Sequence, residues 1–373
     1  MEHGRVGIVG GGQLGRMLTD AALPLGFAVT VIDPVENCPA AQAGAEQIQA
    51  SLKDPDAIRS LASRTDVVTW EIEDIDVTAL EGLPTAVEPS PYTLGTIQDK
   101  LRQKRMLVRA GLPVAAFMDL DPNRLDRDVD MAFKAFGAVI IKARTGGYDG
   151  RGNMSVRPDN SQGIFDRFGD TQLYVERLVP FQKELAVIVA RDVLGNIAQY
   201  PVVETIHENN ICHLVLAPAG IDPRIRADAE EIAHETAGHL DGAGVFAIEM
   251  FLTDGDELLI NEIAPRVHNS GHHTIEANAT SQFEQHIRAI TRLPLGSTEM
   301  ISPAAMINIL GERNGPVALR GLGRVLSLPG THVHLYGKEP TKMERKMGHI
   351  VVISDDVEEA RVIALKARRE LTI

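Results

Sequence analysis

The chain begins with an apolar run that ends in a glycine-rich turn, and this arrangement restricts the fold more than any other feature of the sequence. Residues Arg5–Val9 are predicted to form a strand, and a helix-compatible segment, 13–25, follows it. The turn between them has the pattern G-x-G-x-x-G, with glycines at Gly10, Gly12 and Gly15. A second apolar run, Ala28–Ile32, ends at Asp33. Because strands that alternate with helices favour a parallel sheet covered by helices, we expect a Rossmann-like α/β domain at the N-terminus.

The glycine turn by itself leaves three interpretations open. Glycines let a pyrophosphate approach the backbone at a helix N-terminus, and Asp33 could bind a ribose hydroxyl, which would indicate a dinucleotide site. The same amides could hold another phosphorylated ligand, such as a nucleoside monophosphate. The turn could also serve only to join a strand to a helix. The rest of the chain has to decide among these interpretations.

Length and turn chemistry divide the chain into three predicted domains. With 373 residues the chain is too long for one ordinary core. A proline-rich turn at 88–91 marks the end of the first α/β unit. We expect domains at 1–91, 92–295 and 296–373, with the second divided into a lid subdomain of about 100–175 and a nucleotide- and metal-binding subdomain of about 176–295.

The predicted middle domain mixes antiparallel strands with helices, which is an α+β arrangement. Gly195-Asn196 and Asp254-Gly255 are hairpin signals between strand-like runs. One basic helix is predicted over 92–110 and another helix over 228–242. The last domain is predicted to be small and β-rich.

Composition excludes several classes of partner and location. The net charge of −14 argues against a nucleic-acid or anionic-membrane surface, because phosphate groups need clustered Lys and Arg. No apolar stretch approaches the roughly 20 residues that span a bilayer. The first residues are expected to form a strand and not a signal peptide. Two cysteines, Cys38 and Cys212, are too few for a disulfide framework or a zinc site, so a cytoplasmic protein is expected.

A lysine and a glycine-rich loop follow one another in the middle of the chain. Lys142 ends a predicted buried strand, and RTGGYDGRG follows at 144–152. Glycines let backbone N–H groups turn toward an anion, and Lys142 adds a point charge for phosphate oxygens. The lysine precedes the glycines, so this is not a Walker loop. A plain solvated hairpin would not need so many glycines and cations, and we predict a phosphate-binding loop.

Two acidic residues lie on strands that are predicted to pair. Glu249 stands in the apolar run 245–251, and Glu262 ends the run 258–262 after the turn at Asp254-Gly255. In such a hairpin both carboxylates would point to the same face. A carboxylate in so apolar a strand is costly unless a cation compensates it, and Mg²⁺ favours carboxylates together with phosphates and water. Asn261 could complete the coordination or contact a phosphate.

A polar stretch, APRVHNSGHH, follows at 264–273. Its three histidines lack the repeated helical spacing or the cysteine partners of a zinc site. An anion site built by Arg266 and neighbouring amides is the favoured interpretation.

Together these segments resemble the ATP-grasp superfamily, and within it the N5-carboxyaminoimidazole ribonucleotide synthetases. The resemblance covers essentially the whole chain. It is carried by GQLGRM at 12–17, WEIE at 70–73, RTGGYDGRG at 144–152, NEIAPRVHNSG at 261–271 and GH at 348–349. It implies an ATP-grasp fold and a reaction of purine biosynthesis, in which ATP and bicarbonate carboxylate 5-aminoimidazole ribonucleotide through carboxyphosphate.

The resemblance also implies a nucleotide site. Its members are Lys100, Lys142, Gly147, Tyr148, Asp149, Gly150, Arg151, Gly152, Asn153, Glu176, Arg177, Leu178, Val179, Glu184, His207, Asn261 and Glu262. Glu249 and Glu262 are the implied ligands of Mg²⁺, with Mn²⁺ as a substitute. Lys100 stands where relatives often carry arginine, so its phosphate contact would be a point charge and not a bidentate one.

The remaining implied contacts concern bicarbonate and the ribonucleotide. Arg266, His268 and Asn269 would form the bicarbonate or carboxyphosphate pocket. Tyr148, Asp149 and Arg151 would act from the lid, the first two on the imidazole and amine of the ribonucleotide. The ribonucleotide would meet Gln13, Leu14, Glu73, Lys338 and Arg345, with its 5′-phosphate on the last two. Glu71 and Glu73 either touch the ribose or stabilise the strand end. The family also implies a homodimer.

Three other functions compete with this one. A formate-dependent glycinamide ribonucleotide transformylase would share the fold and also use an acyl phosphate. A nicotinamide-dependent oxidoreductase would use the glycine turn but leave the Lys142 loop and the Glu249/Glu262 pair unexplained. A non-catalytic nucleotide-binding module is the third.

Overall fold

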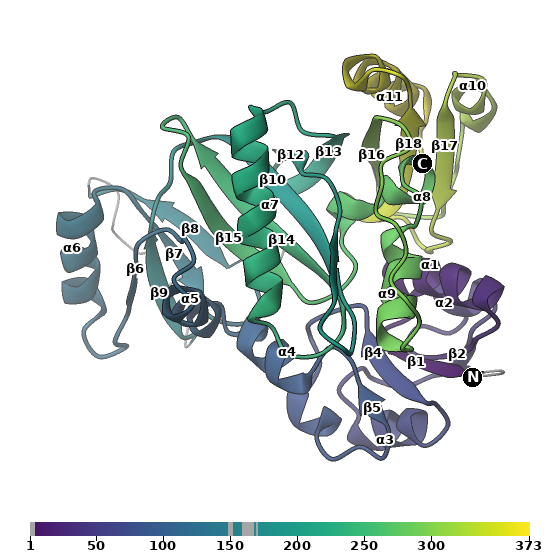
Figure 1. Cartoon of the computed structure of the whole chain (residues 1–373), viewed down its shortest axis with the longest axis horizontal. Coiled ribbons are helices and arrows are strands. Elements are labelled where there is room, and N and C mark those ends of the chain that lie inside the picture. Colours follow the sequence, from purple (N-terminus) through teal and green to yellow (C-terminus); the bar gives the residue numbers. More distant parts are fainter. Residues whose placement is uncertain (1–3, 148–151, 159–167, 169–170) are drawn as a thin grey trace.

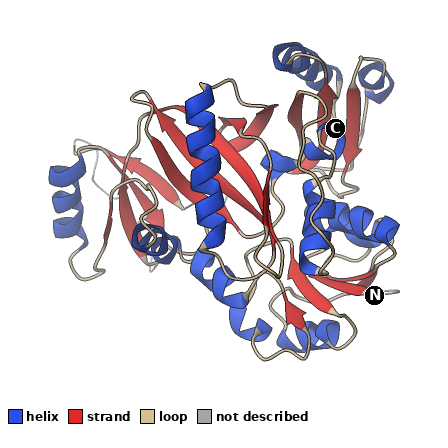
Figure 2. Ribbon diagram, viewed as in Figure 1, coloured by secondary structure: helices blue, strands red, loops and turns tan. Residues whose placement is uncertain are grey.

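The computed structural model describes residues 4–147, 152–158, 168 and 171–373. The described strands form three sheets, and the C-terminal strands belong to the largest of them. Figures 1 and 2 show the N-terminal sheet at the lower right and the C-terminal strands at the upper right, with helices against the sheets. The first sheet is parallel throughout and has the order β3-β2-β1-β4-β5. Its strands are β1 (Arg5–Val9), β2 (Ala28–Ile32), β3 (Glu46–Ile48), β4 (Val67–Trp70) and β5 (Ala86–Val87), and its helices are α1 (Gln13–Ala22), α2 (Pro39–Gln42) and α3 (Pro55–Ala62). The predicted Rossmann-like domain is confirmed.

The single basic helix predicted over 92–110 is wrong, because the chain forms two helices there. These are α4 (Pro91–Gln98) and α5 (Lys100–Arg109). Asp99 lies between them in an extended conformation, and its carboxylate accepts hydrogen bonds from the N–H groups of Leu101 and Arg102. An aspartate at this position satisfies amides that the start of a helix leaves without partners. The break makes Lys100 the first residue of α5.

The lid sheet has four strands in the order β6-β9-β7-β8, all antiparallel. They are β6 (Phe117–Asp119), β7 (Val139–Ala143), β8 (Asn153–Val156) and β9 (Leu173–Arg177). Helix α6 (Leu125–Phe136) packs its apolar face against them through Val129 and Ala132. Figure 1 shows this lid sheet at the left, beside the largest sheet.

The large sheet runs in the order β15-β14-β10-β12-β13-β16-β18-β17, and β11 pairs with β10. Its strands are β10 (Phe181–Arg191), β11 (Ile197–Gln199), β12 (Val203–Glu208), β13 (Ile211–Ala217), β14 (Gly244–Thr253), β15 (Leu258–Ala264), β16 (Ala304–Leu310), β17 (Thr331–Leu335) and β18 (Lys346–Ile353). Both predicted hairpins, β10–β11 and β14–β15, are confirmed. The C-terminal strands continue the sheet, because β16 pairs with β13.

Helices cover the large sheet and join it to the first domain. They are α7 (Pro223–Gly238), α8 (Thr274–Ala277), α9 (Gln282–Ile290), α10 (Leu322–Leu326) and α11 (Val357–Glu370). One apolar core contains Leu14 of α1, Phe283 and Ile287 of α9, and Tyr336, so the N-terminal domain packs directly on the rest of the chain. His286 crosses the same junction, accepting from the Val245 N–H at 3.1 Å and contacting the Thr69 hydroxyl at 2.9 Å.

Candidate functional site

The predicted acidic pair lies where two strands of the large sheet meet. Glu249 of β14 and Glu262 of β15 are direct cross-strand partners, so both carboxylates lie on one face as expected. Burial, and then the charge of Glu262, raise the pKa of Glu249 to about 7. Lys100 donates to Glu262 Oε2 at 2.7 Å, and this charge lowers the pKa of Glu262. Two carboxylates whose pKa values are shifted in opposite directions therefore share one site.

A β-bulge at the pair changes the direction of the neighbouring asparagine. The register shifts between Glu249 and Met250, which leaves Asn261 as the extra residue of β15. Its Oδ1 accepts a hydrogen bond from Lys142 Nζ at 3.4 Å. The bulge thus joins the lysine at the end of β7 to the strand that carries Glu262.

A buried cluster of charges surrounds Lys142. Glu176 of β9 is 2% exposed, and its carboxylate contacts Lys142 Nζ at 3.2 Å and Lys104 Nζ at 3.5 Å. Tyr174 donates to the other carboxylate oxygen at 2.6 Å. Although burial disfavours the charged form, the two lysines lower the pKa of Glu176. Two ammonium groups and one carboxylate leave this cluster with an excess of positive charge.

Lys104 belongs to this cluster, and the sequence analysis missed it as a site residue. It is 1% exposed and donates to the Ile260 carbonyl at 3.0 Å. Burial lowers its pKa to about 8. The available signal was the spacing of Lys104, which lies three residues from each of the two apolar residues Leu101 and Leu107. This spacing places the lysine on the buried face of α5. An exposed basic helix would not place a lysine there.

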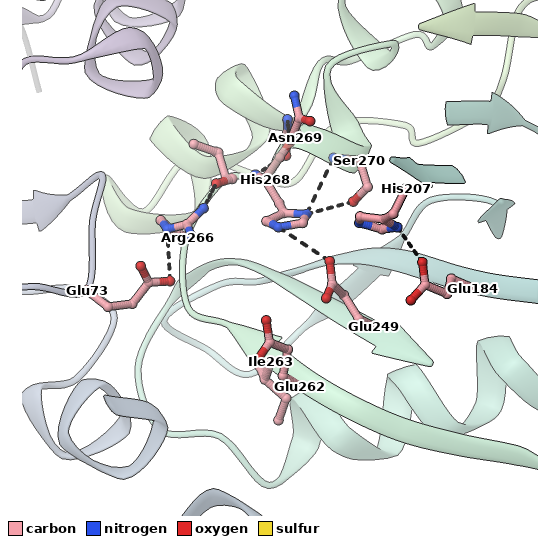
Figure 3. Close-up of polar contacts among 12 residues, drawn as sticks. Glu73, Glu184, His207, Glu249, Glu262, Ile263, Arg266, His268, Asn269 and Ser270 are labelled. Atoms are coloured by element: carbon pink, nitrogen blue, oxygen red, sulfur yellow. Dashed lines mark hydrogen bonds and ion pairs between the residues drawn. The ribbon is translucent and has the colours of Figure 1, made fainter. Parts of the chain in front are cut away.

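The predicted anion pocket lies next to the acidic pair. Figure 3 shows Arg266 directed at Glu73, and His268 directed at Glu249. The distances are 2.9 Å from Arg266 Nε to Glu73 Oε1 and 3.5 Å from His268 Nε2 to Glu249 Oε1. Burial, and then Arg266, hold the pKa of His268 well below its usual range, so its ring is neutral.

Hydrogen bonding assigns the tautomer of the His268 ring. The Ser270 N–H donates to Nδ1 at 3.4 Å, and the Ser270 hydroxyl lies 2.9 Å from the same nitrogen. Nδ1 is therefore an acceptor and Nε2 carries the proton. In this form His268 offers a donor, not a base, to whatever lies near Glu249.

The Asn269 side chain has a structural partner. It forms a reciprocal amide pair with Asn308 of β16, with donor–acceptor distances of 3.1 and 2.6 Å. Asn308 also donates to the Cys212 carbonyl at 2.7 Å. This pair fixes the turn that carries His268, and the predicted substrate contact of Asn269 stays a prediction.

Other predicted nucleotide residues line the same region. His207 of β12 is paired with Glu184 of β10, and this contact raises the His207 pKa although burial opposes it. The segment 176–179 covers the end of β9 and the start of the connection to β10, which links the lid sheet to the large sheet. Within it the Arg177 and Leu178 N–H groups donate to Ala116 and Ala138 carbonyls.

An apolar patch lies beside this connection. Val179 packs with Ala115, Leu259 and Phe251, and the rings of Phe181 and Phe251 stack at 4.6 Å. Such a patch suits a flat heteroaromatic ring, and the sequence analysis did not identify its aromatic members. A Phe at the strand position two after Glu249 was the available signal.

The glycine loop is described only in part. Gly152 has a φ of +85°, its carbonyl accepts from the Ala143 N–H at 2.8 Å, and Asn153 pairs with Lys142. Gly147 lies at the other end of the loop. The predicted residues Tyr148, Asp149, Gly150 and Arg151 lie outside the described residues.

Glu71 decides the role of the N-terminal glycine turn. Its carboxylate accepts hydrogen bonds from the Gly12 N–H and, at 2.6 Å, the Gly15 N–H. A Cβ at Gly12 would lie 2.6 Å from Glu71 Oε1. The glycines thus admit a side chain of the protein to the helix N-terminus. A pyrophosphate would need these amides, so the dinucleotide interpretation is wrong.

Lys338 of the C-terminal basic pair lies near this same turn, and Arg345 donates to the Pro340 carbonyl at 2.6 Å. Burial lowers the pKa of Lys338 to about 8, with Glu71 opposing and Arg345 reinforcing the shift. The Gly337 carbonyl accepts from Gln42 Nε2 at 3.0 Å, which holds the segment against the N-terminal domain. The predicted residues Gln13 and Leu14 begin α1 at this junction. The fold therefore brings two ends of the chain together here.

Among the described residues, no three His, Cys, Asp or Glu side chains gather as a metal cluster. None of the helices in the described part of the chain is long and apolar enough to cross a membrane.

This fold and site define a protein of the ATP-grasp class. Family models match the ribonucleotide synthetase preATP-grasp domain at residues 3–98, the ATP-grasp domain at 105–283 and the phosphoribosylaminoimidazole carboxylase C-terminal domain at 304–362. The N5-carboxyaminoimidazole ribonucleotide synthase of Synechococcus elongatus is 40% identical over 356 residues, which are 93% of this chain and 89% of that protein. The chain belongs to the N5-carboxyaminoimidazole ribonucleotide synthases.

Two further relatives extend the comparison. The phosphoribosylaminoimidazole carboxylase of Schizosaccharomyces pombe is 44% identical over 366 residues, 95% of this chain. The chain spans 66% of that longer protein. The crystal structure of N5-carboxyaminoimidazole synthase from Aspergillus clavatus, in complex with ADP and 5-aminoimidazole ribonucleotide, is 38% identical, has a TM-score of 0.92 and matches 99% of both chains.

Proposed function

We propose that the chain uses ATP and bicarbonate to carboxylate 5-aminoimidazole ribonucleotide, giving N5-carboxyaminoimidazole ribonucleotide, ADP and phosphate. The observation that carries the proposal is the meeting of Lys100, Lys142 and the Glu249/Glu262 pair beside Arg266. This is an arrangement for phosphoryl transfer next to a pocket for a small anion. The relative solved with ADP and 5-aminoimidazole ribonucleotide supports the same substrates.

The acidic pair fits a magnesium ion. Burial and the neighbouring carboxylate disfavour the second negative charge on Glu249, and a divalent cation would relieve both effects. Magnesium is usually held by one or two carboxylates together with phosphates and water, which matches this donor set. When bound, the ion would neutralise charge on the phosphates, and Mn²⁺ would serve in the same way.

Lys142 and Lys100 would hold the ATP phosphates. The net positive charge of the buried cluster around Lys142 favours an anion at its ammonium group. Lys100 already lies on Glu262 and could bridge that carboxylate to a phosphate oxygen. The apolar patch at Val179 and Phe251 would accept the adenine ring. Glu184 and His207 lie further along the same site and would meet the ribose.

Arg266 and His268 would hold bicarbonate and then carboxyphosphate. Arg266 supplies a permanent charge, and His268 supplies an Nε2–H donor in its neutral form. Because bicarbonate is a poor electrophile, ATP would first phosphorylate it to carboxyphosphate and release ADP. The amine of the ribonucleotide would then attack the carbonyl carbon of carboxyphosphate, or the CO₂ that it releases, and phosphate would leave. Catalysis here would consist mainly of positioning and charge neutralisation.

Lys338 and Arg345 would bind the 5′-phosphate of the ribonucleotide. Lys338 lies near the start of α1, where the first-turn N–H groups of Gln13 and Leu14 have no partner within the helix, and Arg345 is among the charges that act on Lys338. Glu71 already occupies the Gly12 and Gly15 amides, so it stabilises the turn. Glu73, paired with Arg266, lies between this region and the anion pocket.

The resemblance to the family supports a homodimer, and the buried thiols of Cys38 and Cys212 suit the reducing cytoplasm. We retain the division at 1–91, 92–295 and 296–373 as a proposal. Sedimentation of the purified chain would test the dimer.

ADP release tests the reaction. The purified chain is incubated with ATP, magnesium and bicarbonate, with and without 5-aminoimidazole ribonucleotide. We expect strong stimulation by the ribonucleotide that also requires bicarbonate. ADP formed only with formate and glycinamide ribonucleotide would identify the transformylase instead, and no ATP consumption with any combination would refute an enzymatic role.

A further inference from the structure

An arginine-lined groove lies on the outer face of helices α4 and α5, away from the acidic pair. Its volume is about 460 Å³, and its charged lining consists of Arg102, Arg105, Arg109, Arg144 and Asp99. Tyr92 and Thr96 of α4 and His239 complete it. Of the site residues described above, Lys100 adjoins the groove, because its backbone N–H donates to the Arg144 carbonyl at 2.8 Å. Asp99 separates the groove from Lys100, which points to Glu262 instead.

The groove carries more positive charge than its own acids neutralise. Arg144 is paired with Asp99, and Arg105 is paired with Asp119 at 2.9 Å. Arg102 lies over the Tyr92 ring, 5.2 Å from its centroid. Arg109 has no ion pair among the residues that the structure describes. Two guanidinium charges thus have no carboxylate partner within the described part of the chain.

Spacing along α5 concentrates this charge. Arg102, Arg105 and Arg109 are three and four residues apart, so they share one exposed face, while Leu101, Lys104 and Leu107 form the buried face. Like charges at this spacing repel one another and destabilise a helix. The chain as a whole carries a net charge of −14, so a face of this kind departs strongly from the rest of the protein.

We propose that this groove binds the phosphate groups of a small polyanion, as a second anion site distinct from the ATP phosphate site. Guanidinium forks match phosphate oxygens in a bidentate way, and several of them suit two or more phosphates better than one. The volume admits a triphosphate or a nucleotide. The Tyr92 ring, whose residue is 65% exposed, stands at the edge where a base could stack.

Tripolyphosphate without magnesium is the probe, titrated by calorimetry at constant ionic strength. The ATP phosphate site is removed with Lys142→Ala, and the groove with the double variant Arg102→Ala/Arg109→Ala. Because each charge-assisted contact is worth about tenfold in affinity, we expect about a hundredfold weaker binding when both arginines are removed in the Lys142→Ala background. Lys142→Ala should leave the groove affinity unchanged.

Two matched variants control for charge and folding. Arg59→Ala/Arg64→Ala removes the same charge from the surface of the N-terminal domain, where both arginines pair with carboxylates, and should change the affinity less than twofold. Arg102→Lys/Arg109→Lys keeps the charge and should retain part of the binding. Urea unfolding of each variant verifies that it is folded.

Three results would overturn the proposal. The first is binding to Lys142→Ala that is unchanged when Arg102→Ala/Arg109→Ala is added. The second is equal weakening by Arg59→Ala/Arg64→Ala, which would mean non-specific attraction. The third is no binding to Lys142→Ala at all.

A last comparison, made in Lys142→Ala, identifies the source of the phosphates. Tighter binding of UTP than of tripolyphosphate, lost in Tyr92→Ala, supports a nucleotide. Equal affinities support a free polyphosphate.

Discussion

Replacing Glu71 with alanine would empty the helix N-terminus that its carboxylate now fills. The Gly12 and Gly15 N–H groups would lose their acceptor, and both lie in a buried turn next to Lys338. Each buried N–H without a partner costs about 1–3 kcal/mol, and water entering the space would restore part of that. The variant also no longer buries the Glu71 carboxylate, whose pKa burial raises, and this further reduces the loss of stability. We therefore expect Glu71→Ala to lower the free energy of unfolding by about 2–4 kcal/mol.

Urea unfolding measures this loss, and a small carboxylate should reverse it. Formate can enter the space and accept from the same two amides. At a hundred times its dissociation constant, a ligand specific for the native state returns about 2.7 kcal/mol. Formate should therefore stabilise Glu71→Ala and leave the wild-type chain unchanged, since Glu71 already fills the position there.

Glu46→Ala is the matched control. Glu46 is an exposed acid of the same domain, 3.5 Å from Arg64, and such surface pairs contribute about 0–1 kcal/mol. A loss below about 0.5 kcal/mol in Glu71→Ala would refute the reasoning. Equal stabilisation of Glu71→Ala and wild type by formate would show that the amides are not the binding site.

Three further perturbations test other parts of the site. Glu262→Gln should abolish ATP turnover while the chain stays folded, because a metal ligand is lost; near-normal turnover would contradict the metal assignment. Arg345→Ala should raise the Michaelis constant for the ribonucleotide by about tenfold, and a rise for ATP instead would contradict the phosphate assignment. Lys104 has a pKa of about 8 in the folded chain against its ordinary 10.5, so the unfolded chain binds more protons between these values and stability should rise with pH across that window. The gain, on the order of 3 kcal/mol, should be absent in Lys104→Met, and parallel pH profiles of the two chains would rule out the shift.

Local sequence patterns predicted much of the fold and the chemistry of the site. The parallel N-terminal sheet, both hairpins and the shared face of Glu249 and Glu262 followed from patterns that involve residues close together in the chain. Lys142 at the end of β7 followed from the same kind of reasoning. A turn or a strand periodicity is a local property, so the sequence contains it in readable form.

Tertiary structure alone decided which side chains complete those local features. Glu71 follows strand β4 and reaches the glycine turn although it lies 56 residues after Gly15. This contact rules out the dinucleotide interpretation. Asn308 pairs with Asn269 over 39 residues, and Lys104 reaches Ile260 over 156. The continuation of the large sheet from β13 to β16 likewise depends on pairing between distant strands. Burial and hydrogen bonding between remote segments have no period along the chain, and only the folded packing determines which partner each polar group finds.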